Sequence, residues 1–131
     1  TGLLAITAAL HGAKQVTAVD NNPLACEVAR ANCRMNNVKH LVTVRQQDLR
    51  RDFPEVHGYN LVIANLYRGL LEQLFNTPAF WEADFYILSG FIQGMEGELL
   101  GQIPGDRLRF LDRLRSEKWC IWVLANRKIT G

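Results

Sequence analysis

The sequence lacks the marks of several large protein classes. No apolar run reaches the roughly 18 residues that a membrane-spanning helix requires, so no membrane protein is expected. The three histidines stand far apart, no cysteine–histidine group has zinc-site spacing, and no metal centre is predicted. The three cysteines are an odd set without paired spacing, which is typical of free thiols in a reducing compartment and favours a cytoplasmic protein.

An excess of charge of one sign is also missing. The formal net charge is only +2 over 131 residues, which is too small to predict nucleic-acid binding and does not exclude it. Arginines gather between residues 45 and 51 and again between 107 and 115, and such groups are typical of solvated faces. With 48% apolar and 21% charged residues, the chain is expected to form one globular domain, residues 1–131, with one core.

Apolar periodicity divides the chain into alternating helices and strands. Helices are expected over 1–10, 23–35, 66–75 and 93–103, and the alternation is complete if a short helix fills part of 49–58. Strands are expected over 15–19, 41–47, 59–64 and 84–90, followed by an antiparallel hairpin of 107–114 and 119–125. This order predicts an α/β fold, a Rossmann-like, doubly wound and mostly parallel sheet with a C-terminal antiparallel hairpin.

The first twenty residues carry the most informative motif. Gly2 opens a helix, and Asp20 ends a strand about 20 residues later, which is the second half of a nucleotide-binding unit. The glycine lets a cofactor approach free helix N–H groups, and the carboxylate accepts hydrogen bonds from ribose hydroxyls. The strand and the earlier glycines of such a unit are not in the sequence. We therefore expect a domain that is incomplete at its N-terminus and lacks its first strand.

Polar side chains follow four of the expected strands, namely Asp20, Asp48, Asn65 and Ser89. Each alone has a local explanation, because Asp commonly caps a helix and Asn or Ser-Gly commonly forms a turn. Ligands of such sheets bind beyond the carboxyl ends of the strands, where all four side chains would lie. Together they predict a functional site at this edge.

These segments resemble the class I S-adenosylmethionine-dependent methyltransferases. Within that class, they are most similar to the ribosomal-protein (PrmA-like) branch, which modifies amino groups of a large-subunit ribosomal protein. The resemblance covers nearly the whole chain and is most specific from Thr1 to Leu66. It rests on Thr1-Gly2-Leu3-Leu4-Ala5-Ile6, Val19-Asp20-Asn21-Asn22-Pro23-Leu24-Ala25, Ala29-Arg30-Ala31-Asn32, Asn36-Asn37-Val38, Asp48-Leu49, Leu61-Val62-Ile63-Ala64-Asn65-Leu66 and Ile87-Leu88-Ser89-Gly90-Phe91.

The resemblance implies a role for each matching residue. Asp20 would hold the ribose hydroxyls of S-adenosylmethionine, and Asp48 would face the adenine edge. Asn65 and the backbone carbonyl of Leu66 would be catalytic, because they would orient the incoming amine for in-line attack on the methyl carbon. The full set of implied cofactor-binding residues is Thr1, Gly2, Asp20, Asn21, Asp48, Leu49 and Asn65.

The sequence also departs from the family. Many amino-group methyltransferases of this class carry Asn-Pro-Pro-Tyr/Phe after the fourth strand, whereas this chain has Asn65-Leu66-Tyr67-Arg68. The segment is more similar to the ribosomal-protein branch, but Tyr67 and Arg68 are bulkier than that branch leads us to expect. The N-terminal substrate-recognition domain of the branch has no counterpart in the sequence.

The methyl acceptor and the activity therefore stay open at this point. A protein substrate such as a ribosomal protein is the first expectation, and an RNA or small-molecule acceptor is the alternative, because the fold does not determine the acceptor. A cofactor-binding domain without catalysis is a further alternative. An NAD-dependent dehydrogenase domain is the last, since Gly2 and Asp20 alone would serve either cofactor. The sequence does not predict an oligomeric state.

Overall fold

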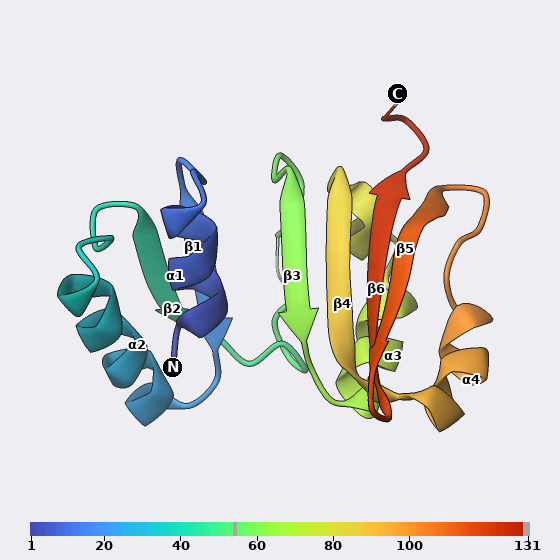
Figure 1. Ribbon diagram of the computed structural model, residues 1–131, viewed down its shortest axis with the longest axis horizontal. Coiled ribbons are helices and arrows are strands. Elements are labelled where there is room, and N and C mark those ends of the chain that lie inside the picture. Colours follow the sequence, from blue (N-terminus) through green and yellow to red (C-terminus); the bar gives the residue numbers. More distant parts are fainter. Residues whose placement is uncertain (54, 130–131) are drawn as a thin grey trace. The chain divides into compact units, whose positions relative to one another are not determined.

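The computed structural model describes residues 1–53 and 55–129. The chain divides into two compact units, Thr1–Asp52 and Phe53–Gly131, each with its own sheet and its own helices (Figure 1). Helices and parallel strands alternate along the chain, which confirms the predicted α/β class. None of the helices within the described ranges is long and apolar enough to cross a membrane.

The first unit packs two helices on a two-stranded parallel sheet. Its second helix begins at Pro23, because the Asn22 side chain accepts hydrogen bonds from two backbone N–H groups of the first turn at 2.9 and 3.2 Å. Asp20 pairs with Gln46 at the last position of the sheet, so the carboxyl ends of the two strands lie together. The elements are α1 (Leu3–Leu10), β1 (Val16–Asp20), α2 (Pro23–Met35) and β2 (Val42–Gln46).

The core of the first unit is built from small side chains. Helix α1 contributes alanine and isoleucine, and α2 contributes the buried Cys33. This cysteine is a free thiol, as the sequence predicted. Such a core lets the helices lie close to the sheet, because little volume separates the backbones. Its buried members are Ala5, Ile6, Ala9, Cys33, Val38 and Val42.

The second unit is a four-stranded mixed sheet in the order β3-β4-β6-β5. Strands β3 and β4 are parallel, and β6 runs antiparallel to both of its neighbours, which confirms the predicted C-terminal hairpin. The elements are β3 (Leu61–Asn65), α3 (Arg68–Phe75), η1 (Pro78–Glu82), β4 (Phe85–Ile92), η2 (Gln93–Met95), α4 (Glu96–Leu100), β5 (Leu108–Ser116) and β6 (Trp119–Asn126).

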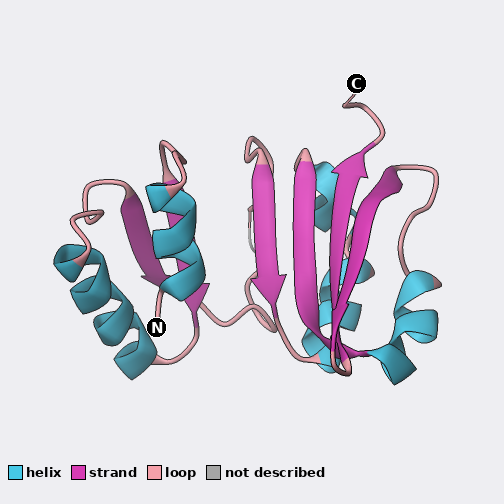
Figure 2. Ribbon diagram, viewed as in Figure 1, coloured by secondary structure: helices cyan, strands magenta, loops and turns pink. Residues whose placement is uncertain are grey.

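Helices lie against one face of this second sheet and bury a cluster of aromatic side chains (Figure 2). Phe75 of α3 stacks on Trp122 of β6, with a centroid separation of 6.4 Å. The buried Tyr86 hydroxyl is fully used, because it donates to the Phe80 carbonyl at 2.7 Å and accepts from the Ala83 N–H at 2.9 Å. Burial raises the pKa of Tyr86 to about 12, although the Ala83 hydrogen bond acts in the opposite direction.

Two helix predictions differ from the structure. Within 49–53 and 55–58 the chain forms turns rather than the short helix that would complete the alternation. Helix α3 begins at Arg68 rather than at Leu66, because the Leu66 N–H donates to the Ser89 carbonyl at 3.1 Å and so continues the pairing of β3 with β4. The short helix η1 was not predicted, since its five residues are too few to show a periodicity.

The second half of the unit also differs in its boundaries. Strand β4 continues to Ile92 instead of ending in a turn at Gly90, where the structure has a bulge. The hairpin turn is limited to Glu117 and Lys118, and Glu117 takes a φ of +57°, as tight two-residue turns require. The helix expected over 93–103 is a short η2 followed by α4, because glycine weakens the segment.

Glu96 is a buried carboxylate that joins α4 to the hairpin. It is 5% exposed and accepts a hydrogen bond from the Trp122 indole N–H at 2.8 Å. Its oxygens also pair with Arg113 at 2.8 Å and Arg115 at 2.9 Å. Burial by itself raises the pKa of Glu96, but the three hydrogen bonds outweigh burial and lower the pKa to about 2.

Replacing Glu96 by glutamine should destabilise the protein in a pH-dependent way. At pH 7, Glu96→Gln should lower the free energy of unfolding by about 2–3 kcal/mol, because the amide loses charge-assisted hydrogen bonds. The pKa of Glu96 is lower in the folded protein than its ordinary 4.5, so its stabilisation is present above that pH and is lost as the pH falls toward about 2. Urea unfolding at pH 7 and pH 3 measures the difference between the two proteins, which should shrink in acid. An unchanged difference would contradict this account.

Candidate functional site

The amino end of α1 lies at the carboxyl edge of the first sheet, beside the ends of β1 and β2 (Figure 1). Gly2 caps this helix with a φ of +80°, in the left-handed region that favours glycine. A Cβ at Gly2 would lie 3.1 Å from the Cβ of Ala29, so the glycine lets α1 begin close against α2. Thr1 is held there too, because Asn32 donates to its carbonyl at 2.8 Å. Backbone N–H groups at a helix start are available to a ligand.

Asp20 ends β1 at the same edge, and its side chain is exposed. One carboxylate oxygen accepts from the Asn22 N–H at 3.0 Å, which keeps the carboxylate beside the start of α2. The other oxygen has no partner among residues 1–53 and 55–129. Asn21 is also exposed, and its carbonyl accepts a hydrogen bond from the Gln46 side chain at 3.5 Å. This edge therefore offers one free carboxylate oxygen to a ligand.

Asp48 follows β2 and is bound by its own loop. Arg50 donates to the carboxylate from Nε and Nη2, at 3.1 Å each, and from its backbone N–H at 3.0 Å. These bonds, the side-chain ones first, hold the pKa of Asp48 below its ordinary value. The sequence did not predict this ion pair between Asp48 and Arg50. All the predicted cofactor residues of the first unit thus follow or precede elements at one sheet edge: Thr1, Gly2, Asp20, Asn21, Asp48 and Leu49.

Asn65 and Leu66 stand at the carboxyl end of β3 in the second unit. The Asn65 side chain is exposed, and its carboxamide makes no hydrogen bond within the described part of the chain. The backbone that follows is held firmly, because the Leu66 N–H donates to the Ser89 carbonyl at 3.1 Å. The arrangement presents a free carboxamide on a fixed backbone, which can accept a hydrogen bond from a ligand N–H.

Gly90 explains why this backbone can lie so close to β4. It has a φ of +103° and stands in a bulge between Ser89 and Phe91. A Cβ at Gly90 would lie 2.7 Å from the Leu66 nitrogen and closer still to the Leu66 carbonyl oxygen, so no other residue fits without a shift of backbone. The bulge fits the tendency of such irregularities to occur next to functional sites.

The expectation for Ser89 was wrong in one respect. Ser89 does not end β4, because the strand continues past it, and its register partners are Asn65 on β3 and Ile121 on β6. Its carbonyl holds Leu66, so it supports the site through the backbone. A glycine inside a strand pattern was the signal that could have indicated this close approach, since such glycines commonly mark a bulge or a close backbone contact.

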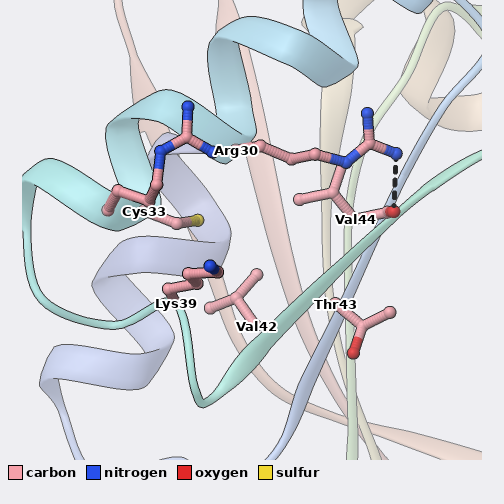
Figure 3. A pocket seen from close by; sticks show the side chains of 7 residues that line it. Arg30, Cys33, Lys39, Val42, Thr43 and Val44 are labelled. Atoms are coloured by element: carbon pink, nitrogen blue, oxygen red, sulfur yellow. Dashed lines mark hydrogen bonds between the residues drawn. The ribbon is translucent and has the colours of Figure 1, made fainter.

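A shallow basic pocket of ≈ 280 Å³ lies between α2 and β2 (Figure 3). The Arg30 guanidinium donates to the Val44 carbonyl at 3.1 Å and so covers part of the outer edge of β2. Arg34 stands in the last turn of α2, where a cation interacts favourably with the helix carbonyls. The residues that line the pocket are Arg30, Cys33, Arg34, Lys39, Val42, Thr43 and Val44. The predicted site residues are not among them.

The sequence matches the family described as "Ribosomal protein L11 methyltransferase (PrmA)" over residues 1–127. A relative from Carboxydothermus hydrogenoformans named "Ribosomal protein L11 methyltransferase" is 31% identical over 130 residues, which are 94% of this chain and 40% of the relative. The chain thus spans about 40% of the length of the curated relatives that it matches.

Solved structures agree with this match at the level of the fold. A ribosomal protein L11 methylase from Lactobacillus delbrueckii subsp. bulgaricus aligns with a TM-score of 0.82 at 20% identity, over 95% of this chain and 64% of that one. An RNA methyltransferase from Salinibacter ruber in complex with S-adenosyl-L-homocysteine aligns with a TM-score of 0.70 at 18% identity, over 99% and 78% of the two chains. These similarities confirm the predicted class I methyltransferase fold.

Replacing Gly90 by alanine should destabilise the second unit. Gly90→Ala should cost about 2–5 kcal/mol, because the methyl group would overlap the backbone of Leu66 and the backbone conformation is strained for alanine. Chemical denaturation measures the cost. Gly94→Ala is the matched control, since a Cβ there meets nothing within 4 Å, and it should change the stability by less than about 0.5 kcal/mol. Equal effects of the two changes would contradict the role of Gly90.

Proposed function

Because the chain belongs to the ribosomal protein L11 methyltransferase family, we propose that the protein transfers methyl groups from S-adenosylmethionine to an amino nitrogen of a protein substrate, such as a ribosomal protein. The observation that carries the proposal is the free Asn65 carboxamide on a fixed backbone, at the strand end where the family resemblance requires it. Residues 1–131 would form one catalytic domain in this proposal.

The first unit would hold the cofactor, and its residues fit that role. The free oxygen of Asp20 can accept from the ribose hydroxyls while its other oxygen stays bonded to the Asn22 N–H. The left-handed Gly2 leaves the start of α1 without a side chain, so a ligand can approach the helix N–H groups. Asp48 would accept from the adenine amino group, because a carboxylate has acceptor capacity beyond its bonds to Arg50. Thr1, Asn21 and Leu49 would line the same edge.

The second unit would bind the methyl acceptor. When bound, S-adenosylmethionine supplies a methyl group on a sulfonium centre, which reacts with a nucleophile placed in line. An amine attacks only as the neutral base, so the ammonium form must first give a proton to solvent water. The Asn65 carboxamide and the Leu66 carbonyl can both accept from the amine N–H groups and so direct the lone pair. A neutral amide suits this task, because it accepts from the amine N–H without adding a cation.

An RNA acceptor is the second candidate. The observation that favours it is the basic pocket around Arg30, Arg34 and Lys39, because such cations attract phosphate groups. The two candidates differ in a simple assay. Labelled S-adenosylmethionine should label an RNA-free ribosomal protein fraction if the acceptor is a protein, and protein-free ribosomal RNA if the acceptor is RNA.

Asp20→Ala in the intact protein should weaken the binding of S-adenosylhomocysteine by about 1–3 kcal/mol, because the ribose hydroxyls lose their acceptor. Calorimetric titration measures the change. Asp52→Ala is the control, since Asp52 is an exposed carboxylate outside the predicted site, and its effect should be within error. NADH should not bind in the same titration. Binding of NADH in place of S-adenosylhomocysteine would instead support a dehydrogenase and contradict the proposal.

Asn65→Ala should lower turnover by about 10- to 100-fold, because the acceptor amine is no longer aligned. Cofactor affinity should change little, which separates a loss of alignment from a loss of binding. Initial rates with saturating cofactor, together with a calorimetric dissociation constant, measure both quantities. A normal rate would show that Asn65 is only a turn residue.

A further inference from the structure

Tyr67 is an exposed aromatic side chain directly after the proposed acceptor residues. It is 58% exposed, and its hydroxyl makes no hydrogen bond to any residue that the structure describes. The ring lies over Gly69, where a Cβ would stand 3.4 Å from the ring carbon Cε2. A Cβ at position 69 would be in ordinary van der Waals contact with the ring. Tyr67 therefore contributes little to the core, although it has a defined resting place on α3.

The backbone on both sides of Tyr67 is fixed. The Leu66 N–H is bonded to the Ser89 carbonyl, and the Tyr67 carbonyl accepts from the Leu71 N–H at 3.1 Å in the first turn of α3. The next side chain is fixed as well, because Arg68 pairs with Glu72 at 2.8 Å and with Glu98 of α4. The ring is thus presented to solvent from a rigid support, which is the arrangement expected of a binding group rather than of a loose surface residue.

The charges around Tyr67 favour a positively charged ligand. Arg68 is the cation nearest in sequence, and its guanidinium is engaged by two carboxylates, those of Glu72 and Glu98. The Arg68 hydrogen bond, which is the largest effect, helps to keep the pKa of Glu72 below its ordinary value, so this carboxylate is ionised at neutral pH. One cation paired with two anions gives this cluster, which begins at the residue after Tyr67, a net negative charge. The face of a tyrosine ring itself attracts cations.

We propose that Tyr67 forms an aromatic wall of the acceptor site and binds the cationic ammonium form of the substrate amine before it loses its proton. The inference rests on the proposed function, because it places the ring beside the acceptor that Asn65 and Leu66 orient. A side-chain amine arrives protonated at neutral pH. The ring contacts the positive charge and the aliphatic stem of the amine without accepting a conventional hydrogen bond. Every N–H of the amine therefore stays available to Asn65 and Leu66. Tyr67 is then a specificity-determining residue that selects cationic amines.

A second exposed aromatic residue provides the comparison. Trp119 is 48% exposed at the tip of the hairpin, but its ring already has a cation of this chain, the Lys118 ammonium, 5.8 Å from its centroid. A cation from solution would have to displace Lys118. The Trp119 ring is therefore the matched control for the Tyr67 ring. Both rings are accessible, and among the residues that the structure describes no cation lies over the Tyr67 ring.

The binding of a simple cation tests the proposal without any catalysis. Choline should shift the ring resonances of Tyr67 in the intact protein, with the resonances assigned by comparison with Tyr67→Phe. The neutral isostere 3,3-dimethylbutan-1-ol should shift them much less, because it has the same shape without the charge. The ionic strength is held constant with sodium chloride. Equal shifts with both compounds, or shifts at Trp119 alone, would overturn the proposal.

Kinetics provide the second test. Tyr67→Leu should raise the KM for the acceptor about tenfold with little change in kcat, since a cation–π contact of ordinary strength is lost. Tyr67→Phe should restore the normal KM because it keeps the ring, and Trp119→Leu should leave KM unchanged. An unaltered KM in Tyr67→Leu would overturn the inference. The thermal unfolding midpoint should be the same for all three, because neither ring belongs to the core.

The two proposals fail in different ways. If Asn65→Ala loses turnover while Tyr67→Leu keeps its acceptor KM, the methyl-transfer proposal stands and the role of Tyr67 is wrong. If choline binds at Tyr67 but Asn65→Ala keeps full turnover, the cation site stands and the assignment of the acceptor residues is wrong.

Discussion

The second unit depends on one close crossing of backbone, where Gly90 of β4 lies against Leu66 at the end of β3. The crossing needs a residue without a Cβ and with a positive φ, and glycine alone meets both conditions. It brings the Leu66 N–H to the Ser89 carbonyl and so extends the pairing of the two strands beyond Asn65. The groups that we assign to the acceptor site are therefore held by backbone and not by their own side chains.

Three carboxylates, those of Glu96, Asp20 and Asp48, have two different physical roles. Glu96 is buried, has three hydrogen-bond donors and holds α4 against the hairpin. Asp20 and Asp48 stand at the carboxyl edge of the first sheet, and Asp20 keeps an oxygen without a partner among the described residues. A buried, fully paired carboxylate is a structural element, whereas an accessible one at a sheet edge is available to a ligand.

Sequence patterns predicted the elements of the first unit nearly to the residue, because each has a local cause. Asn22 and Pro23 mark the start of α2. The alternation of helices and strands along the chain places Gly2 before α1 and Asp20 at the end of β1. The family resemblance supplied the roles of Asn65 and Leu66, which no spacing could have given. These roles remain predictions until the variants are measured.

The sequence could not predict what depends on contacts between distant segments. The bulge at Gly90 is understandable only when β4 lies beside Leu66, and the burial of Glu96 only when the hairpin supplies Arg113 and Arg115. The pairing of Asp48 with Arg50 joins near neighbours, yet it depends on the turn that the chain makes after β2. The first two are tertiary effects, whereas the third is a local turn that the sequence pattern did not show.

The most direct measurement of the central claim is methyl transfer itself. The intact protein is incubated with isotope-labelled S-adenosylmethionine and a ribosomal protein extract, and the products are analysed by mass spectrometry. The account predicts label on an amino nitrogen of a ribosomal protein. Label in RNA alone, or no label from a protein that binds S-adenosylhomocysteine, would contradict it.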